Sequence, residues 1–199
     1  MIGDRLKPSI VFDVMSTLVV DPFYEAMPAF FGMSFSELLA QKDPNSWIDF
    51  EVNKMTEREF LDGFFKDRRR FDHEAFREAV FSAYRWIDGV EAVLDQLIRS
   101  GYSMAILSNY PCWFQEIQRR LDIDANFDVV LVSYETGTRK PAIESYRNAI
   151  EKLGCVASSC VFVDDSVRTT RAALQLGMDA VLFSNTANLE GSLKRRGLI

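Results

Sequence analysis

Five short runs of apolar, often β-branched residues recur along the chain, one near the N-terminus and four in the second half. Such runs are typical of buried strands, because they are short and polar or turn-forming residues bound them. We expect strands over Ser9–Phe12, Ser103–Leu107, Phe127–Val132, Cys160–Val163 and Ala180–Phe183.

The segments that join the later runs repeat their apolar residues with the period of a helix. One stripe runs from Val90 to Ile98 and is followed by Gly101, a residue that suits the end of a helix. Another runs from Ile143 to Leu153, where Pro141 suits the first turn and Gly154 the end. Strands that alternate with helices of this length predict an α/β fold with a doubly wound parallel sheet. Ligands of such sheets bind beyond the carboxyl ends of the strands.

Residues 21–87 break this alternation, because they contain no strand-like run and read as a series of helices. Thr56–Glu59 has the pattern of a capping box, and Asp72 suits the N-cap of a further helix. We therefore predict a small all-helical domain over 21–87, inserted after the first strand. Residues 1–20 and 88–199 would form the α/β core domain.

Polar residues stand where each of the first four predicted strands gives way to the next element. Asp13 directly follows the first strand, and Ser108–Asn109 follows the second. Lys140 begins the helix after the third strand, and Asp164–Asp165 ends the fourth. Each residue by itself is an ordinary loop or capping residue. Their occurrence in this order predicts one site at the carboxyl edge of the sheet.

The chemistry of these side chains favours phosphoryl transfer. Three carboxylates at neighbouring strand ends repel one another unless a cation lies between them, and oxygen ligands of this kind suit Mg²⁺. Lys140 and the Ser108 hydroxyl can hold the non-bridging oxygens of a phosphate. The Asp13 carboxylate can then act as a nucleophile and form an acyl-phosphate intermediate.

These residues resemble the motifs of the haloacid dehalogenase superfamily, which are D-x-D-x-T, a Ser or Thr, a Lys and an acidic pair. The resemblance covers essentially the whole chain. It implies that Asp13 is the nucleophile and a metal ligand, and that the backbone carbonyl of Met15 is a second ligand. It also implies that Asp164 and Asp165 hold Mg²⁺ directly or through water.

The same resemblance assigns the remaining site residues and the helical insertion. Ser108 would bind phosphate with Asn109 beside it, and Lys140 would steady both the nucleophile and the transferring group. The helices of residues 21–87 lie where this family carries its cap domain.

Three cap segments are similar to the cap of plant-type flavin mononucleotide (FMN) hydrolases, a branch of the superfamily. This similarity implies that FMN or another flavin-pathway phosphate is the substrate. Aromatic rings of the cap, Phe23, Tyr24 or Trp47, could stack on the isoalloxazine; the other interpretation of each ring is packing in the cap core. The three segments are Asp21–Tyr24, Pro28–Met33 and Trp47–Glu51.

The chain departs from the family pattern at the second acid, whose place is taken by Met15. In phosphatases of the family that acid protonates the leaving oxygen and later activates water. Ser16, one position further on, is too weakly acidic to replace it. General acid–base help is worth about 10²–10⁴ in rate. Asp21 or Tyr24, at the entrance to the cap, is our candidate for the missing proton donor.

Two alternative functions remain open at this point. A metal-independent 2-haloacid dehalogenase also lacks the second acid, because a halide leaves without a proton, but it does not need the acidic pair for Mg²⁺. A catalytically degenerate protein could bind phosphate or a partner without turnover. The pair Asp164–Asp165 favours the phosphohydrolase over the dehalogenase. Asp13, Ser108, Lys140 and the pair together argue against a protein without turnover.

Composition and charge limit the possible partners and the location of the protein. The formal charge of −6 disfavours binding to DNA or RNA. No apolar run approaches the ~20 residues that span a bilayer, and nothing near the N-terminus resembles a targeting peptide. Cys112, Cys155 and Cys160 have no metal-binding spacing and suit reduced thiols, so we expect a cytoplasmic protein. The predicted site gives its expected partner, a small phosphorylated substrate. His73 is the only histidine, which argues against a Ser-His-Asp triad. Oligomeric state leaves no signal in the sequence.

Overall fold

The computed structural model describes residues 7–199 and contains a parallel five-stranded sheet. The order of the strands across the sheet is β3-β2-β1-β4-β5. This arrangement confirms the predicted α/β fold class. The strands are β1 (Ser9–Phe12), β2 (Met104–Ser108), β3 (Val129–Val132), β4 (Cys160–Asp164) and β5 (Asp179–Leu182).

The bounds of four strands differ from the prediction, and β3 differs most. Its predicted first residues, Phe127 and Asp128, precede the register of β2 with β3, which begins at Ala105 and Val129. The Phe127 N–H donates to the Asp124 carbonyl and closes a 3-10 turn over Ile123–Asn126. The Asp128 carboxylate accepts from the Met104 N–H at 2.9 Å. The local turn that ends at Phe127 and the side-chain contact of Asp128 with Met104 therefore precede the strand, although the apolar run begins earlier.

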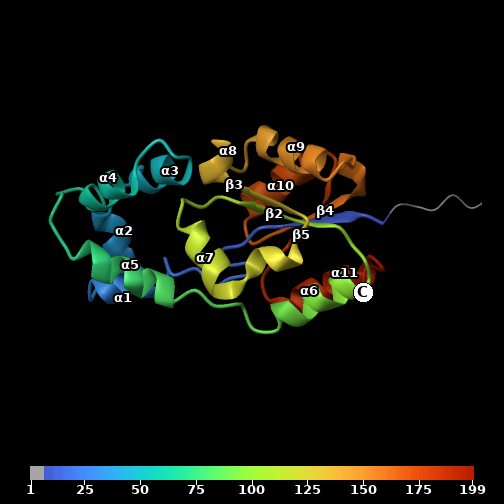
Figure 1. The fold of residues 1–199 in the computed structure, drawn as a ribbon, viewed down its shortest axis with the longest axis horizontal. Helices are drawn as coiled ribbons and strands as arrows, with labels where there is room; N and C mark the ends of the chain where they lie inside the picture. Colours follow the sequence, from blue (N-terminus) through green and yellow to red (C-terminus); the bar gives the residue numbers. More distant parts are fainter. Residues whose placement is uncertain (1–6) are drawn as a thin grey trace, which may run out of the picture.

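Helices cover both faces of the sheet (Figure 1). Alternate residues of β1 belong to different cores: Ile10 and Phe12 pack on one face, and Val11 packs on the other. The first face is covered by α6 (Val90–Arg99), α7 (Phe114–Leu121) and α11 (Thr186–Arg195). The second is covered by α9 (Ile143–Lys152) and α10 (Val167–Gln175).

The predicted helix after β3 begins later than expected. It starts at Ile143 with Ala142 as N-cap, so that Lys140 and Pro141 lie in the loop before it. A short helix that the sequence did not predict, α8 (Ser133–Thr136), precedes this loop, and a 3-10 turn, Ala157–Ser159, precedes β4. Gly154 has a φ of +63° after the helix, as its predicted role at the helix end requires.

Five short helices follow β1 and lie together at one end of the molecule, beside the sheet (Figure 1). We propose that they form the predicted cap domain of residues 21–87. Thr56 and Glu59 form the predicted capping box, and Asp72 accepts from the first turn of the last of these helices. The helices are α1 (Ala26–Phe30), α2 (Phe35–Gln41), α3 (Ser46–Glu51), α4 (Glu57–Asp62) and α5 (His73–Ser82).

Aromatic rings hold these short helices together. Phe50 and Phe60 stack with ring centroids 4.6 Å apart, and both rings contact Trp113, which precedes α7. Helices of five to ten residues are not stable in isolation. Burial of these rings therefore supplies the stability of the helical group and attaches it to the sheet-bearing part.

The side on which successive strands join the sheet changes at β1. β2 and β3 extend the sheet on one side, and β4 and β5 extend it on the other. In open α/β sheets a ligand binds in the crevice at this switch point. The carboxyl ends of β1 and β4 consequently mark the place for a site. Within residues 7–199, no helix is long and apolar enough to cross a membrane.

Candidate active site

Three carboxylates meet at the switch point. One oxygen from each of Asp13, Asp164 and Asp165 lies within 4.8 Å of the others. Asp13 directly follows β1, and its N–H donates to the Val163 carbonyl of β4 at 2.9 Å. The pairing of β1 with β4 thus places residues 150 positions apart at one edge of the sheet.

Lys140 lies between two of these carboxylates. Its Nζ is 2.6 Å from Asp13 Oδ1 and 2.7 Å from Asp164 Oδ2. Burial by itself lowers the pKa of the ammonium group, but the two carboxylates outweigh that effect and raise it. Lys140 therefore stays charged and offsets part of the negative charge beside Asp13.

The side chain of Asn109 fixes the backbone of Lys140. Its amide nitrogen donates to the Lys140 carbonyl at 2.9 Å, and its amide oxygen accepts from the Lys140 N–H at 2.8 Å. The predicted contact of Asn109 with phosphate stays a prediction. The clamp on Lys140 is a contact that sequence reasoning missed, since the two residues are 31 positions apart.

The electrostatics of the cluster leave room for a cation. Burial is the main reason that the pKa of Asp13 is raised to about 7; the neighbouring Asp164 and Asp165 add to the rise, and Lys140 opposes it. Burial and Asp164 likewise raise the pKa of Asp165. A divalent cation would favour the charged forms, and carboxylate oxygens are ligands that Mg²⁺ accepts. The residues present therefore fit Mg²⁺.

Hydroxyl groups orient two of the carboxylates. Thr169 Oγ1 donates to Asp164 Oδ1 at 2.5 Å, and the Ser166 N–H donates to the same oxygen at 2.8 Å. Thr17, which occupies the Thr position of the first motif, is completely buried, with its Oγ1 3.4 Å from Asp13 Oδ2. Thr169 was not among the predicted site residues, although its place in the first turn of the helix after the acidic pair is a local signal.

Ser108 ends β2 with its side chain buried. Its Oγ has no hydrogen-bond partner within residues 7–199. An unsatisfied buried hydroxyl costs free energy, and a phosphate oxygen would satisfy it. The hydroxyl does not line a cavity directly, whereas the next residue, Asn109, does.

A cavity of about 300 Å³ opens over the carboxylates. Two arginines contribute to its wall, Arg139 before Lys140 and Arg168 at the start of α10. Arg139 also forms an ion pair with the buried Glu51 of α3, so that α3 contacts the loop that carries Lys140. The cavity is thus positively charged on one side and acidic at its base.

Asp21 lies on the wall of this cavity together with Tyr24. Burial raises the pKa of the Asp21 carboxyl to about 6, although its hydrogen bond from the Phe23 N–H opposes the rise and Asp165 adds to it. Burial also raises the pKa of Tyr24, whose side chain is half exposed. Of the two candidate proton donors, Asp21 is the one that changes protonation near neutral pH.

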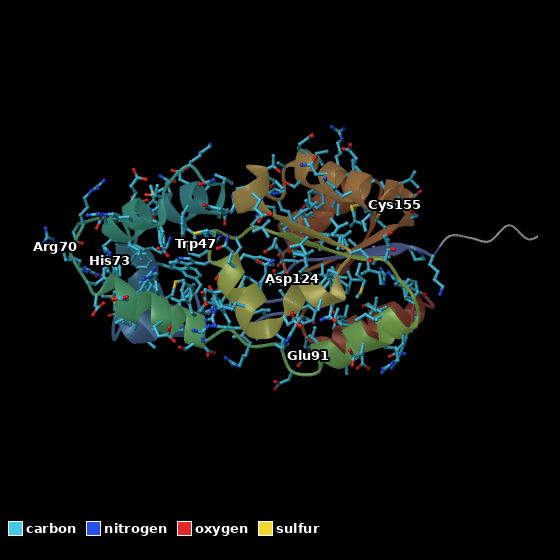
Figure 2. The ribbon with its side chains drawn as sticks, in the orientation of Figure 1. Trp47, Arg70, His73, Glu91, Asp124 and Cys155 are labelled. Carbon is cyan, nitrogen blue, oxygen red and sulfur yellow. The ribbon has the colours of Figure 1, made fainter. Side chains whose placement is uncertain are left out.

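A second cavity of about 240 Å³ adjoins the first. Met15, Asp21 and Asn109 contribute to the walls of both. The walls of the second cavity are otherwise mainly apolar, and Trp47 lies at the border between α3 and α7 (Figure 2). Its further lining residues are Phe23, Lys42, Pro44, Trp47, Ile48 and Tyr110.

His73 takes no part in the site. Figure 2 shows it together with Arg70 at the end of the molecule that is remote from the sheet. Cys112, Cys155 and Cys160 form no disulfide in this structure, and the prediction that they are reduced thiols stays a prediction.

The doubly wound sheet and its Lys-bridged carboxylates at the switch point define the class of protein, a hydrolase built to hold phosphate and a divalent cation. The family model described as haloacid dehalogenase-like hydrolase matches residues 8–177. The chain therefore belongs to the haloacid dehalogenase-like hydrolases. The predicted family and enzyme class are confirmed.

Curated relatives agree with this assignment. The chain is 36% identical to the chloroplastic flavin mononucleotide hydrolase 1 of Arabidopsis thaliana over 194 residues, which cover 98% of this chain and 79% of the relative. It is 31% identical to the ribulose-1,5-bisphosphate 5-phosphatase of Halopiger xanaduensis over 118 residues, 56% of this chain and 49% of that protein.

Solved structures show the same fold. A HAD family enzyme from Bacteroides thetaiotaomicron, in complex with magnesium and inorganic phosphate, has a TM-score of 0.71 at 18% identity, covering 90% of this chain and 96% of that one. The L-2-haloacid dehalogenase of Xanthobacter autotrophicus has a TM-score of 0.67 at 17% identity, covering 98% and 85%. The fold is thus shared by phosphate-binding and dehalogenating enzymes, and the site residues have to distinguish them.

Proposed function

We propose that the protein is a magnesium-dependent phosphohydrolase that cleaves a small phosphate ester through an aspartyl-phosphate. The observation that carries this proposal is the cluster of Asp13, Asp164 and Asp165 around Lys140 at the switch point. A halide displacement needs no such acidic pair, and a protein that only binds phosphate needs no carboxylate nucleophile. The cluster therefore favours the phosphohydrolase over both alternatives.

The residues divide the work as follows. Asp13 attacks phosphorus with one carboxylate oxygen, while Lys140, fixed by Asn109, holds the nucleophile in place and attracts a phosphate oxygen. The Ser108 hydroxyl donates to a second phosphate oxygen. Asp13, Asp164, Asp165 and the Met15 carbonyl would hold Mg²⁺, which would supply positive charge for the phosphate oxygens.

Asp21 takes the place of the missing acid. It lines the same cavity as the nucleophile, and its raised pKa keeps a proton available close to pH 6. It donates this proton to the leaving oxygen, and its carboxylate then accepts a proton from the water that attacks the aspartyl-phosphate. Asp21 thereby compensates for Met15.

FMN is the substrate that the comparisons favour. The Arabidopsis relative is named as a flavin mononucleotide hydrolase and aligns over nearly this whole chain. The second cavity offers Phe23, Trp47 and Tyr110 beside the phosphate site, and aromatic rings of this kind pack well against a flavin. A cytoplasmic location, which the free thiols favour, is part of the same proposal.

A panel of phosphates, with one 2-haloacid for the dehalogenase alternative, tests the function. FMN, phenyl phosphate, acetyl phosphate and 2-chloropropionate are assayed with Mg²⁺ and with EDTA. We expect release of phosphate from FMN that requires Mg²⁺ and disappears in Asp13→Asn, with no release of chloride. Metal-independent chloride release would support the dehalogenase instead, and the absence of both products would support a protein that binds without turnover.

A further inference from the structure

Lys42 is a buried cation that the chemistry of phosphoryl transfer leaves unused. The residue is only 8% exposed, and it directly follows α2. Its Nζ donates to the Asp43 carbonyl at 3.0 Å, and no carboxylate within residues 7–199 forms an ion pair with it. An ammonium group has three donor hydrogens, and burial of an incompletely paired charge is costly. The cation therefore has unused capacity for an acceptor.

The second cavity is where that acceptor can lie. Lys42 contributes to its wall, and Nζ lies 5.7 Å from the centre of the Phe23 ring, which lines the same cavity. The hydroxyl of Tyr110, another wall residue, is already engaged with the Tyr84 hydroxyl at 3.0 Å. Among the residues that line this cavity, Lys42 is the only one with a cationic side chain.

Met15 joins this cavity to the phosphate site. Met15 is among the residues that line both cavities, and it occupies the position of the second acid in the pattern D-x-D-x-T. A carboxylate at this point would offer a charged surface to a leaving group, and a thioether offers an apolar one. The residue that removes the usual acid therefore also extends the apolar wall toward the nucleophile.

We propose that the second cavity binds the leaving group of the substrate and that Lys42 determines its chemistry. The leaving group is flat and largely apolar, and it carries a hydrogen-bond acceptor or a partial negative charge on the edge that faces Lys42. The pyrimidine-dione edge of an isoalloxazine has this character. The inference rests on the proposed function and deepens it, because it states how the site distinguishes a flavin phosphate from an aryl phosphate.

Riboflavin is FMN without its phosphate, so its binding tests the second cavity without the hydrolytic reaction. Its binding to the full-length protein with Mg²⁺ is followed by flavin fluorescence, for the wild type and for Lys42→Met. We expect the dissociation constant for riboflavin to rise about tenfold or more in Lys42→Met, the effect of losing one charge-assisted hydrogen bond. The kcat/KM ratio of FMN to phenyl phosphate should fall by a similar factor, because phenyl phosphate has no acceptor edge.

Two further variants serve as controls. Lys152→Met removes an exposed lysine in the last turn of α9, outside both cavities, and should change neither quantity. Lys42→Arg keeps the charge and should retain more riboflavin affinity than Lys42→Met. If Lys42→Met lacks a cooperative thermal transition, Lys42→Gln, which keeps a donor without the charge, is judged by the same criteria.

The outcomes separate this inference from the proposed function. A riboflavin dissociation constant that is the same in wild type and Lys42→Met overturns the role of Lys42, as does a wild type that hydrolyses FMN without measurable affinity for riboflavin. A wild type that binds riboflavin through Lys42 and hydrolyses no phosphate supports the cavity assignment and overturns the phosphohydrolase instead.

Discussion

At the scale of single residues, the chemistry depends on which residue donates a proton to the leaving oxygen, since position 15 carries Met and not an acid. The pKa of Asp21 is raised toward neutrality by burial, and the residue lies on the walls of both cavities. Asp165 and Tyr24 are titratable neighbours of its carboxyl, and Lys42 lines the second cavity with it. If Asp21 is the proton donor, as proposed, its place beside the helical group would tie proton transfer to the exclusion of water from the cavity.

Replacement of Asp21 by Asn tests this role directly. We expect kcat for FMN to fall by about 10²–10⁴, because an alkoxide then leaves without a proton. Acetyl phosphate should lose far less, since its carboxylate leaving group needs no proton. In the wild type kcat for FMN should decrease as the pH rises through about 6, where Asp21 loses its proton, and this decrease should be absent in Asp21→Asn.

Asp49→Asn is the matched control for this prediction. Asp49 is a half-buried cap carboxyl on α3, outside both cavities of the site. Its replacement should leave the rates and the pH profile as they are. Equal losses for FMN and acetyl phosphate in Asp21→Asn would contradict a role in proton donation and indicate structural damage.

At the scale of elements, short helices depend on their ends more than long ones do. α4 has six residues, and its capping box satisfies two backbone N–H groups: Thr56 Oγ1 accepts from the Glu59 N–H, and Glu59 accepts from the Thr56 N–H. Phe60 of the same helix packs on Phe50 and Trp113. The capping box at the N-terminus of α4 therefore helps to hold Phe60 in place, and Phe60 joins the helical group to the residue before α7.

Thr56→Ala should destabilise the protein by about 0.5–2 kcal/mol, the usual cost of losing a side-chain N-cap. Urea denaturation followed by circular dichroism measures this change in the free energy of unfolding. Thr56→Ser keeps the hydroxyl and is expected to stay close to the wild type. A similar loss in both variants would show that the threonine methyl, rather than the cap, carries the effect.

At the scale of the whole molecule, the sheet brings like charges together and Mg²⁺ stabilises the result. The Asp13, Asp164 and Asp165 carboxylates are close only in the folded state, since they come from two strands that meet at the switch point. A cation that binds the folded state and not the unfolded chain shifts the equilibrium toward folding.

Magnesium should therefore raise the melting temperature. At 100 times its dissociation constant, a ligand of the native state adds about 2.7 kcal/mol, which corresponds to roughly 5–10 °C for a chain of this size. Differential scanning calorimetry with MgCl₂ and with EDTA measures the shift. Asp164→Asn should remove most of it, whereas Asp95→Asn, on the exposed side of α6, should retain it. A shift of equal size in Asp164→Asn would place the cation elsewhere.

Much of this structure could be predicted from the sequence, because many of its signals are local. Alternating apolar runs and helical stripes gave the α/β class, and the capping residues Thr56 and Asp72 act where they were expected. The bounds of β3 and the start of α9 were predicted too early, since hydrogen bonds of Asp128 and the loop before Ile143 compete with the apolar pattern. The catalytic roles assigned to individual residues stay predictions until activity is measured.

The sequence by itself determined which chemical groups stand at the ends of the strands, because strand periodicity and the position of a polar residue after a strand are properties of neighbouring residues. Only the tertiary structure decided which of those groups meet. The order of the strands places Asp13 beside Asp164, commits Asn109 to the Lys140 backbone, and leaves Lys42 buried beside an apolar cavity. Contacts between distant segments depend on how all the elements pack at once, and no local pattern in the chain records that result.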